Sequence, residues 1–208
     1  GLGRLYQLDA RLRPNGNKGP LAASLAGFEQ YWKEGALADW ERLALTRARL
    51  IAGDAGVGER AIHLIRSAVF SPLRTTNLAQ EVRAMRKRIE ETAEEGDLKR
   101  GKGALVDIEF LVQYLQLLHG PAFPPLRQTN TQEALQALLK FKKIPPEDGE
   151  VLLKAYAFFG RMANCVRVVH GLSANRLPAK PAELQKLALR VPYTDRSARS
   201  AGVQLMDD

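Results

Sequence analysis

Residues 104–119 read ALVDIEFLVQYLQLLH, and this stretch decides the fold class. Wound as a helix, it is apolar almost all the way round instead of along one stripe. A helix of this kind is stable only where other elements cover it on several sides. We therefore predict that a buried helix at 104–119 forms the centre of a helical domain.

The segments around this stretch also favour helices. After residue 20 the apolar side chains recur about every 3.6 positions, as Leu78, Val82, Met85 and Ile89 do in one stripe. The further predicted helices cover 22–34, 36–52, 57–70, 76–95, 131–141, 146–170, 181–190 and about 195–207. We expect Trp40 in the core and Cys165 packed as a small apolar residue.

The N-terminal residues follow another period. Between residues 4 and 13 apolar and polar side chains alternate, which predicts a strand with one buried face. Proline, glycine and asparagine at 14–20 end it. A lone strand needs neighbours for its backbone groups, so we expect it to be the remnant of an incomplete domain. The predicted fold class is an all-α helical bundle with a short N-terminal β-strand remnant.

Composition limits the function classes. The 208 residues carry a net charge of +8 and no apolar run near the ~20 residues that span a bilayer. The single cysteine and the three separated histidines predict neither a disulfide nor a zinc site, and a cytoplasmic protein is expected. The positive charge suits anionic partners such as nucleotides. Aromatic residues make up only 7%, so nucleic-acid binding is not favoured.

Three charged residues on the predicted strand are candidates for chemistry. Asp9, Arg11 and Arg13 share its polar face. A carboxylate is a hard oxygen ligand for Mg²⁺, and guanidinium groups bind phosphate oxygens. From the spacing alone, a solvent-facing strand edge with ordinary ion pairs is the more common explanation.

Two glycine clusters are candidates for phosphate-binding loops. The cluster at 53–58 follows a predicted helix and lacks the dinucleotide order, so a turn between helices is favoured. The cluster at 101–103 precedes the central helix, where Lys102 and the first amides could touch an anion. A plain turn is again the simpler explanation.

The central helix carries one polar seam. Asp107 lies in its first turn, where the helix dipole favours negative charge. Glu109, Gln113 and Gln116 follow at helical spacing. A structural seam and a role facing a cleft are equally compatible with this pattern. Arg47, on the preceding helix pair, either reaches the strand or is solvated.

Taken in order, several motifs resemble one enzyme family. They are LYQLDARLRPNG at 5–16, GPL at 19–21, WE at 40–41, RAR at 47–49, GD at 53–54, EVRAMR at 81–86, DLK at 97–99 and DIEFLVQY at 107–114. This ordered set, which runs through at least 4–140, is similar to the glutamine-synthetase adenylyltransferases. The segment 160–208 matches only weakly.

The resemblance implies a function in nitrogen metabolism. Members carry two nucleotidyltransferase units, each followed by a helical domain. One unit transfers AMP from ATP to a tyrosine of glutamine synthetase, the other removes it by phosphorolysis, and a PII-type protein sets the balance. The resemblance assigns 1–20 to the end of a catalytic domain and 21–208 to its helical domain. The residues of the first motif, and Val106 at a position where the deadenylylating unit usually has arginine, are more similar to the adenylylating half.

The resemblance also implies roles for the strand residues. Asp9 corresponds to the third metal-binding carboxylate of a site that works with Mg²⁺ and ATP. Arg11 and Arg13 occupy positions that face phosphates, and Lys102 is a further candidate for nucleotide binding. The Gly-Ser-Asp-x-Asp type of motif that supplies the first two carboxylates does not occur in this chain. We therefore expect the chain alone to be inactive.

Two alternatives remain open at this point. The first is the helical domain of a PII uridylyltransferase-like enzyme, which follows a similar catalytic unit. The second is a basic helical module that binds a protein or nucleic acid, for which steeply salt-dependent binding would be expected.

Overall fold

The computed structural model describes residues 9–10, 12–13, 16–33, 37–72, 77–170 and 175–190. This part of the chain is helical and contains no strand, which confirms the all-α class. The helices are α1 (Leu25–Lys33), α2 (Asp39–Leu45), α3 (Ala55–Val69), α4 (Leu78–Glu90), α5 (Leu105–His119), α6 (Thr131–Lys140), α7 (Pro146–His170) and α8 (Pro181–Ala188), with short 3₁₀ turns η1 (Gly16–Lys18) and η2 (Pro124–Leu126). None of the described helices is long and apolar enough to cross a membrane.

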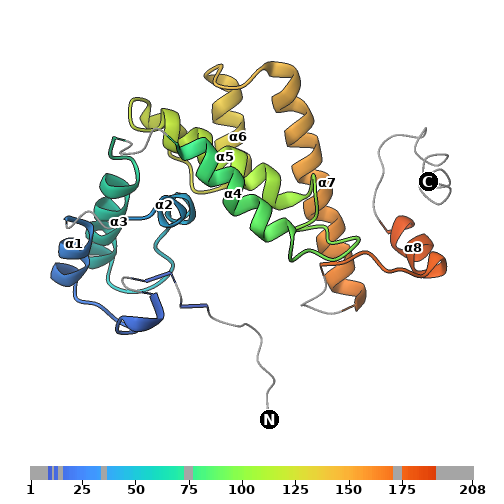
Figure 1. Cartoon of the computed structure of the whole chain (residues 1–208), viewed down its shortest axis with the longest axis horizontal. Helices are drawn as coiled ribbons and strands as arrows, with labels where there is room; N and C mark the ends of the chain where they lie inside the picture. Colours follow the sequence, from blue (N-terminus) through green and yellow to red (C-terminus); the bar gives the residue numbers. More distant parts are fainter. Residues whose placement is uncertain are drawn as a thin grey trace, which may run out of the picture.

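The predicted central helix is confirmed. Helix α5 contacts α2 and α4 on one side and α6 and α7 on the other. In Figure 1, α1, α2 and α3 lie at one end of the molecule, α4 and α5 in the middle, and α7 and α8 at the other end. One core cluster joins α5 to α6 and α7, and a second joins it to α2, α3 and α4. Each covers part of the apolar surface of α5, as its sequence requires.

Local signals set several helix ends. The carboxylate of Asp54 accepts a hydrogen bond from the amide of Val57 and so caps α3. Asn130 caps α6 in the same way through the amides of Gln132 and Glu133. Gly53, with a φ of +112°, makes the turn before α3, as predicted for the start of the first glycine cluster. The prediction is wrong for Gly56 and Gly58, which lie inside α3.

The predicted N-terminal strand is not supported where it can be checked. Most of 4–13 falls outside the described residues. Asp9, Ala10, Leu12 and Arg13 are described and belong to no strand. A strand needs a neighbouring strand for its ladder, and the described part of the chain contains none. The predicted helix at 195–207 also lies outside the described residues.

The prediction of one helix over 36–52 is wrong. Helix α2 ends at Leu45, and the Thr46 hydroxyl donates to the Leu43 carbonyl at 2.7 Å. The chain then runs without helix to α3. The predicted core position of Trp40 is also wrong, since this side chain is 49% exposed. So short a helix buries only one face, and that face carries Arg42 and Leu43.

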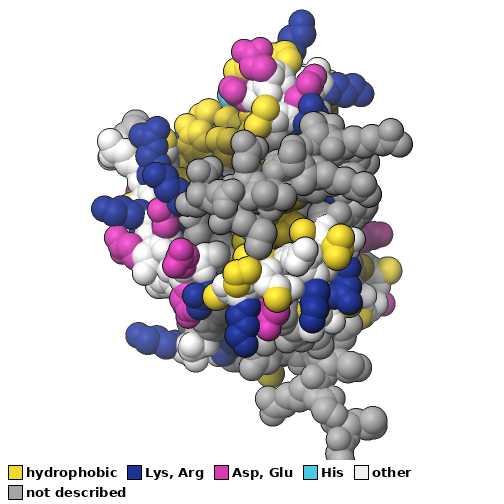
Figure 2. Space-filling model, turned by 90° about the vertical axis from the view of Figure 1, so that its right-hand side faces the viewer, with side chains coloured by type: hydrophobic (Ala, Val, Ile, Leu, Met, Phe, Trp, Pro, Cys, Tyr) yellow, Lys and Arg dark blue, Asp and Glu magenta, His cyan; other side chains and the backbone are white. Residues whose placement is uncertain are grey.

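The surface has mixed charge. On the face shown in Figure 2, Lys and Arg side chains of the described residues are interspersed with Asp and Glu, and a hydrophobic area lies near its upper edge. Among the described side chains visible on this face, Lys and Arg do not form a continuous patch of the kind that a nucleic-acid-binding module uses. Cys165 packs, half-buried, against the cluster of Leu98, Val166 and Leu187, as predicted for a small apolar residue.

Candidate functional site

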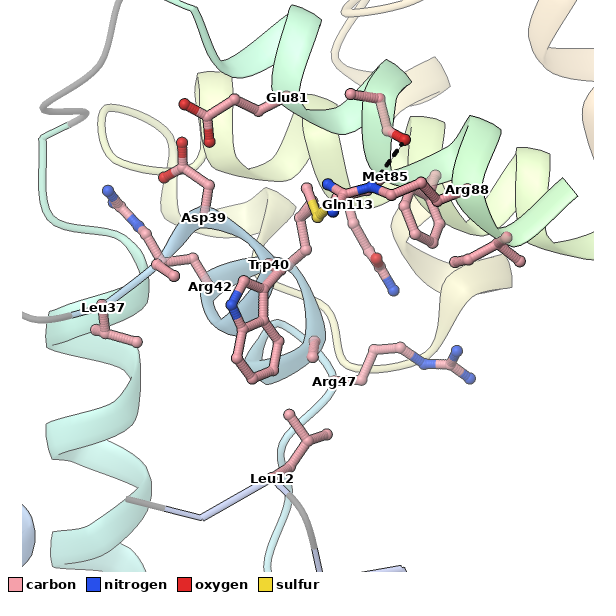
Figure 3. Close-up of a pocket in the computed structure, with 16 residues that line it drawn as sticks. Leu12, Leu37, Asp39, Trp40, Arg42, Arg47, Glu81, Met85, Arg88 and Gln113 are labelled. Atoms are coloured by element: carbon pink, nitrogen blue, oxygen red, sulfur yellow. Dashed lines mark hydrogen bonds between the residues drawn. The ribbon is translucent and has the colours of Figure 1, made fainter. Parts of the chain in front are cut away.

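A groove opens where α2, α4 and α5 meet, with a volume of about 1180 Å³ (Figure 3). Its lining is mostly apolar and comes from all three helices and from Leu12 in the N-terminal segment. The lining residues are Leu12, Leu37, Ala38, Asp39, Trp40, Arg42, Leu43, Ala44, Arg47, Glu81, Ala84, Met85, Arg88, Ile89, Phe110 and Gln113. A concave apolar surface with a few polar groups is the usual form of a ligand site.

Buried polar contacts hold the three helices in place. From α2, Arg42 donates to the Val69 carbonyl at 2.7 Å and to the Ser71 carbonyl at 2.5 Å, which ties it to the end of α3. From α4, Arg86 binds both carboxylate oxygens of Asp107 in the first turn of α5, at 2.5 and 2.9 Å. The groove walls are therefore fixed by charge-assisted hydrogen bonds in addition to packing.

The polar seam of α5 divides into three different roles. Gln116 is buried, and its amide nitrogen donates to the carbonyls of Leu126 and Gln128 at 2.7 and 2.8 Å. Glu109 forms an ion pair with Arg47, with an Oε1–Nη1 distance of 3.0 Å. Gln113 lies between Glu109 and Gln116 in the sequence of α5 and faces the groove. The members of the seam therefore differ, since Gln116 is structural, Glu109 pairs with the groove residue Arg47, and Gln113 itself lines the groove.

Two carboxylates stand together at one end of the groove. Figure 3 shows Asp39 at the start of α2 facing Glu81 on α4. The negative charge of Asp39 raises the pKa of Glu81 above its usual value, and slight desolvation and a hydrogen bond between the two side chains act in the same direction. This end of the groove is unfavourable for a phosphate.

The loop before α5 is built around Asp97. Burial would raise the pKa of this carboxyl, but hydrogen bonds from the backbone amides of Arg100 and Lys99, and the Arg100 guanidinium, outweigh burial and lower it. Gly101 packs directly on this turn, where an added Cβ would lie 2.6 Å from the Asp97 carbonyl oxygen. The glycine is therefore required for close backbone approach.

The start of α5 already holds an anion of its own. The Asp107 carboxylate accepts a hydrogen bond from the Gly103 amide at 2.6 Å while it binds Arg86. Lys102 is exposed between the two glycines. A plain turn accounts for this loop, and its amide at Gly103 is occupied by a side chain of the same chain.

The predicted nucleotide-site residues are only partly described. Asp9 is exposed, and Arg11 lies outside the described residues. Arg13 is half-buried and donates to the carbonyls of Ala10 and, at 3.4 Å, Gly19. Neither Asp9, Arg13 nor Lys102 lines the groove, but Leu12, three residues after Asp9, does.

Sequence reasoning missed most of the groove. Trp40 was assigned to the core, and the carboxylates of Asp39 and Glu81 were not singled out. One signal was present, because Gln113 belongs to a polar seam on an otherwise apolar helix. The position of Leu12 beside α2 had no signal in the local sequence.

Similarity to known proteins covers nearly the whole chain. Residues 1–63 match the family profile described as glutamate-ammonia ligase adenylyltransferase. Residues 74–208, about two thirds of the chain, match the profile described as GlnD PII-uridylyltransferase. The groove is lined from both segments, with Leu12 and α2 in the first and α4 and α5 in the second.

Individual relatives agree with these profiles. The bifunctional glutamine synthetase adenylyltransferase/adenylyl-removing enzyme of Xanthomonas axonopodis pv. citri is 37% identical over 93% of this chain and 21% of its own length. The enzyme of the same name from Xanthobacter autotrophicus is 36% identical over 97% of this chain and 21% of its own length. The chain thus spans about a fifth of the length of these relatives. It belongs to the glutamine synthetase adenylyltransferase family, and its residues 74–208 belong to the family described as GlnD PII-uridylyltransferase.

Proposed function

We propose that this chain is part of an enzyme that transfers AMP from ATP to a tyrosine of glutamine synthetase, or removes it by phosphorolysis, and thereby regulates nitrogen assimilation in the cytoplasm. The observation that carries the proposal is the similarity to relatives of that name over more than nine tenths of the chain. The motif with Val106 favours the adenylylating half, and a PII-type protein is the proposed regulator.

The proposal divides the chain into two parts. Residues 1–20 are the last strand and loop of a nucleotidyltransferase domain, which finds its partner strands in the preceding part of the enzyme. Residues 21–208 are the helical domain. Leu12 supports this division, because it brings the N-terminal segment against the groove between α2, α4 and α5.

Asp9 is the proposed catalytic carboxylate and metal ligand, and Arg11, Arg13 and Lys102 are the proposed phosphate contacts. The exposed carboxylate of Asp9 is a suitable hard ligand for Mg²⁺. Within the described residues, however, no group of three or more His, Cys, Asp or Glu side chains could hold a metal ion. The proposal takes the first two metal-binding carboxylates from other parts of the enzyme, as the family resemblance implies, and we expect the chain alone to be inactive.

The test is AMP transfer by a longer protein that joins this chain to the preceding catalytic strands of the enzyme. Labelled ATP and glutamine synthetase should give labelled synthetase, and Asp9→Asn should abolish the labelling with the fold intact. Arg83→Gln, a change on the exposed face of α4, is the control that should keep full activity. A folded, ATP-binding protein that transfers no AMP and removes none in the presence of phosphate would refute the proposal.

A second candidate is uridylyl transfer to a PII protein. The match of residues 74–208 to the PII-uridylyltransferase profile favours it. The same longer protein supplied with labelled UTP and PII distinguishes the two functions. Labelled PII without labelled glutamine synthetase would select this second candidate.

A further inference from the structure

Gln113 presents an open hydrogen-bonding group inside the groove. Its side chain is 8% exposed, and the structure gives its amide no hydrogen-bond partner among the described residues. Gln116, one turn further along α5, is more deeply buried, at 2% exposed, and donates to two carbonyls. Among the described residues, the Gln113 amide is not one of the fully enclosed unpaired groups, so it is reached from the groove and can donate to and accept from a ligand that enters there.

The walls around this amide suit a flat ring. Trp40 on α2 and Gln113 on α5 border the same groove (Figure 3), and Met85 and Phe110 also line it. The Trp40 indole is 49% exposed, although an indole of this size is normally covered. Aromatic side chains of this kind bind nucleobases by stacking, and each stacked base contributes about 1–3 kcal/mol.

The groove also lies within reach of the proposed catalytic carboxylate. Asp9 is three residues from Leu12, so their Cα atoms are at most roughly 11 Å apart. Arg47 lies on the same side of the groove as Leu12 in Figure 3, while Asp39 and Glu81 lie on the opposite side. Arg47 is already paired with Glu109, but the carboxylate pair disfavours phosphates at its own end of the groove and leaves the end near Leu12 and Asp9 for them.

We propose that this groove binds the adenine nucleoside of the nucleotide, with the Gln113 amide hydrogen-bonding the edge of the base and Trp40 packing on its face. A glutamine amide carries a donor next to an acceptor, which matches the amino group and ring nitrogen of adenine. The inference rests on the proposed nucleotidyl transfer, and it assigns base recognition to the helical domain.

The binding test uses the 208-residue chain and AMP. Two-dimensional NMR should show that AMP shifts the side-chain signals of Gln113 and Trp40 first, with a dissociation constant on the order of 1 mM for a base held without its metal site. Ribose 5-phosphate at the same concentration should not shift them. Gln113→Met and Trp40→Ala should each weaken AMP binding about tenfold. Gln136→Met, the same change on the exposed face of α6, should leave it unchanged.

The experiments test the proposed binding site and the proposed AMP transfer independently. No shift in the groove with 10 mM AMP, or equal affinity in Gln113→Met and Gln136→Met, would overturn the inference, whatever transfer activity the longer enzyme has. In the longer enzyme, Gln113→Met should raise the KM for ATP about tenfold and leave kcat nearly unchanged, whereas Asp9→Asn removes kcat. If AMP binds in the groove and the longer enzyme transfers no AMP, the proposed binding site is supported and the proposed reaction is rejected.

Discussion

The guanidinium of Arg86 on α4 donates hydrogen bonds to both carboxylate oxygens of Asp107 on α5, with an Nε–Oδ1 distance of 2.5 Å and an Nη2–Oδ2 distance of 2.9 Å. The same Nη2 donates to the Gly101 carbonyl at 2.7 Å, and Asp107 accepts from the Gly103 amide. One buried ion pair thus joins two helices and the loop between them.

Replacement of one partner of this pair should be strongly destabilising. We expect Asp107→Asn to lower the free energy of unfolding by about 2–3 kcal/mol, because Arg86 then stays buried with only the more distant carboxylate of Glu90, at 3.7 Å, as its counter-charge. The partial exposure of Asp107 keeps the cost below that of a fully buried pair. Urea unfolding measures it, and Arg86→Met combined with Asp107→Asn should cost less than the sum of the single changes. Strict additivity would argue against the pair as the joining element.

Gly101 should not tolerate a side chain. We expect Gly101→Ala to cost about 1–3 kcal/mol, since the new methyl group would meet the Asp97 carbonyl oxygen, which belongs to the backbone and cannot rotate away. Thermal unfolding checks the change, and Lys102→Ala in the same loop should have an effect within about 0.5 kcal/mol. Equal stability of the two variants would contradict the steric explanation for this glycine.

The Gln116 amide holds the turn at 126–128 against α5. Gln116→Met, which keeps the volume, should cost about 1–3 kcal/mol because the carbonyls of Leu126 and Gln128 lose their donor. The matched exposed change Gln136→Met should be close to neutral. Denaturant unfolding of both variants gives the comparison, and a cost as small for Gln116→Met as for Gln136→Met would mean that water replaces the amide.

The carboxylate pair predicts a dependence of stability on pH. The pKa of Glu81 is raised in the folded protein, so its charge opposes folding at neutral pH, and this destabilisation disappears as pH falls through the raised value towards 4.5. Glu81→Gln should therefore raise the melting temperature at pH 7 and give no gain near pH 4. Glu59→Gln on the exposed surface of α3 is the control. A gain that does not change with pH would show that repulsion by Asp39 is not its cause.

Much of the helical domain follows from local sequence. The sequence predicts a central helix at 104–119, apolar on almost every side, and a further helix at 131–141, and the structure confirms both as α5 and α6. Such features depend on residues within a few turns of one another. The sequence does not predict that α2 ends at Leu45. The position of this short helix depends on a tertiary contact, the hydrogen bond from Arg42 to the end of α3, which local spacing does not show.

The sequence by itself determined the helical class, the central position of α5 and the polar seam along it, because each depends on side-chain spacing within one segment. Only the tertiary structure decided what the members of that seam do. Gln113 and Gln116 are the same residue type three positions apart, yet Gln116 faces the carbonyls of the 126–128 turn and Gln113 faces the groove between α2 and α4. Their surroundings come from segments far away in the chain, so local spacing cannot distinguish the structural amide from the open one.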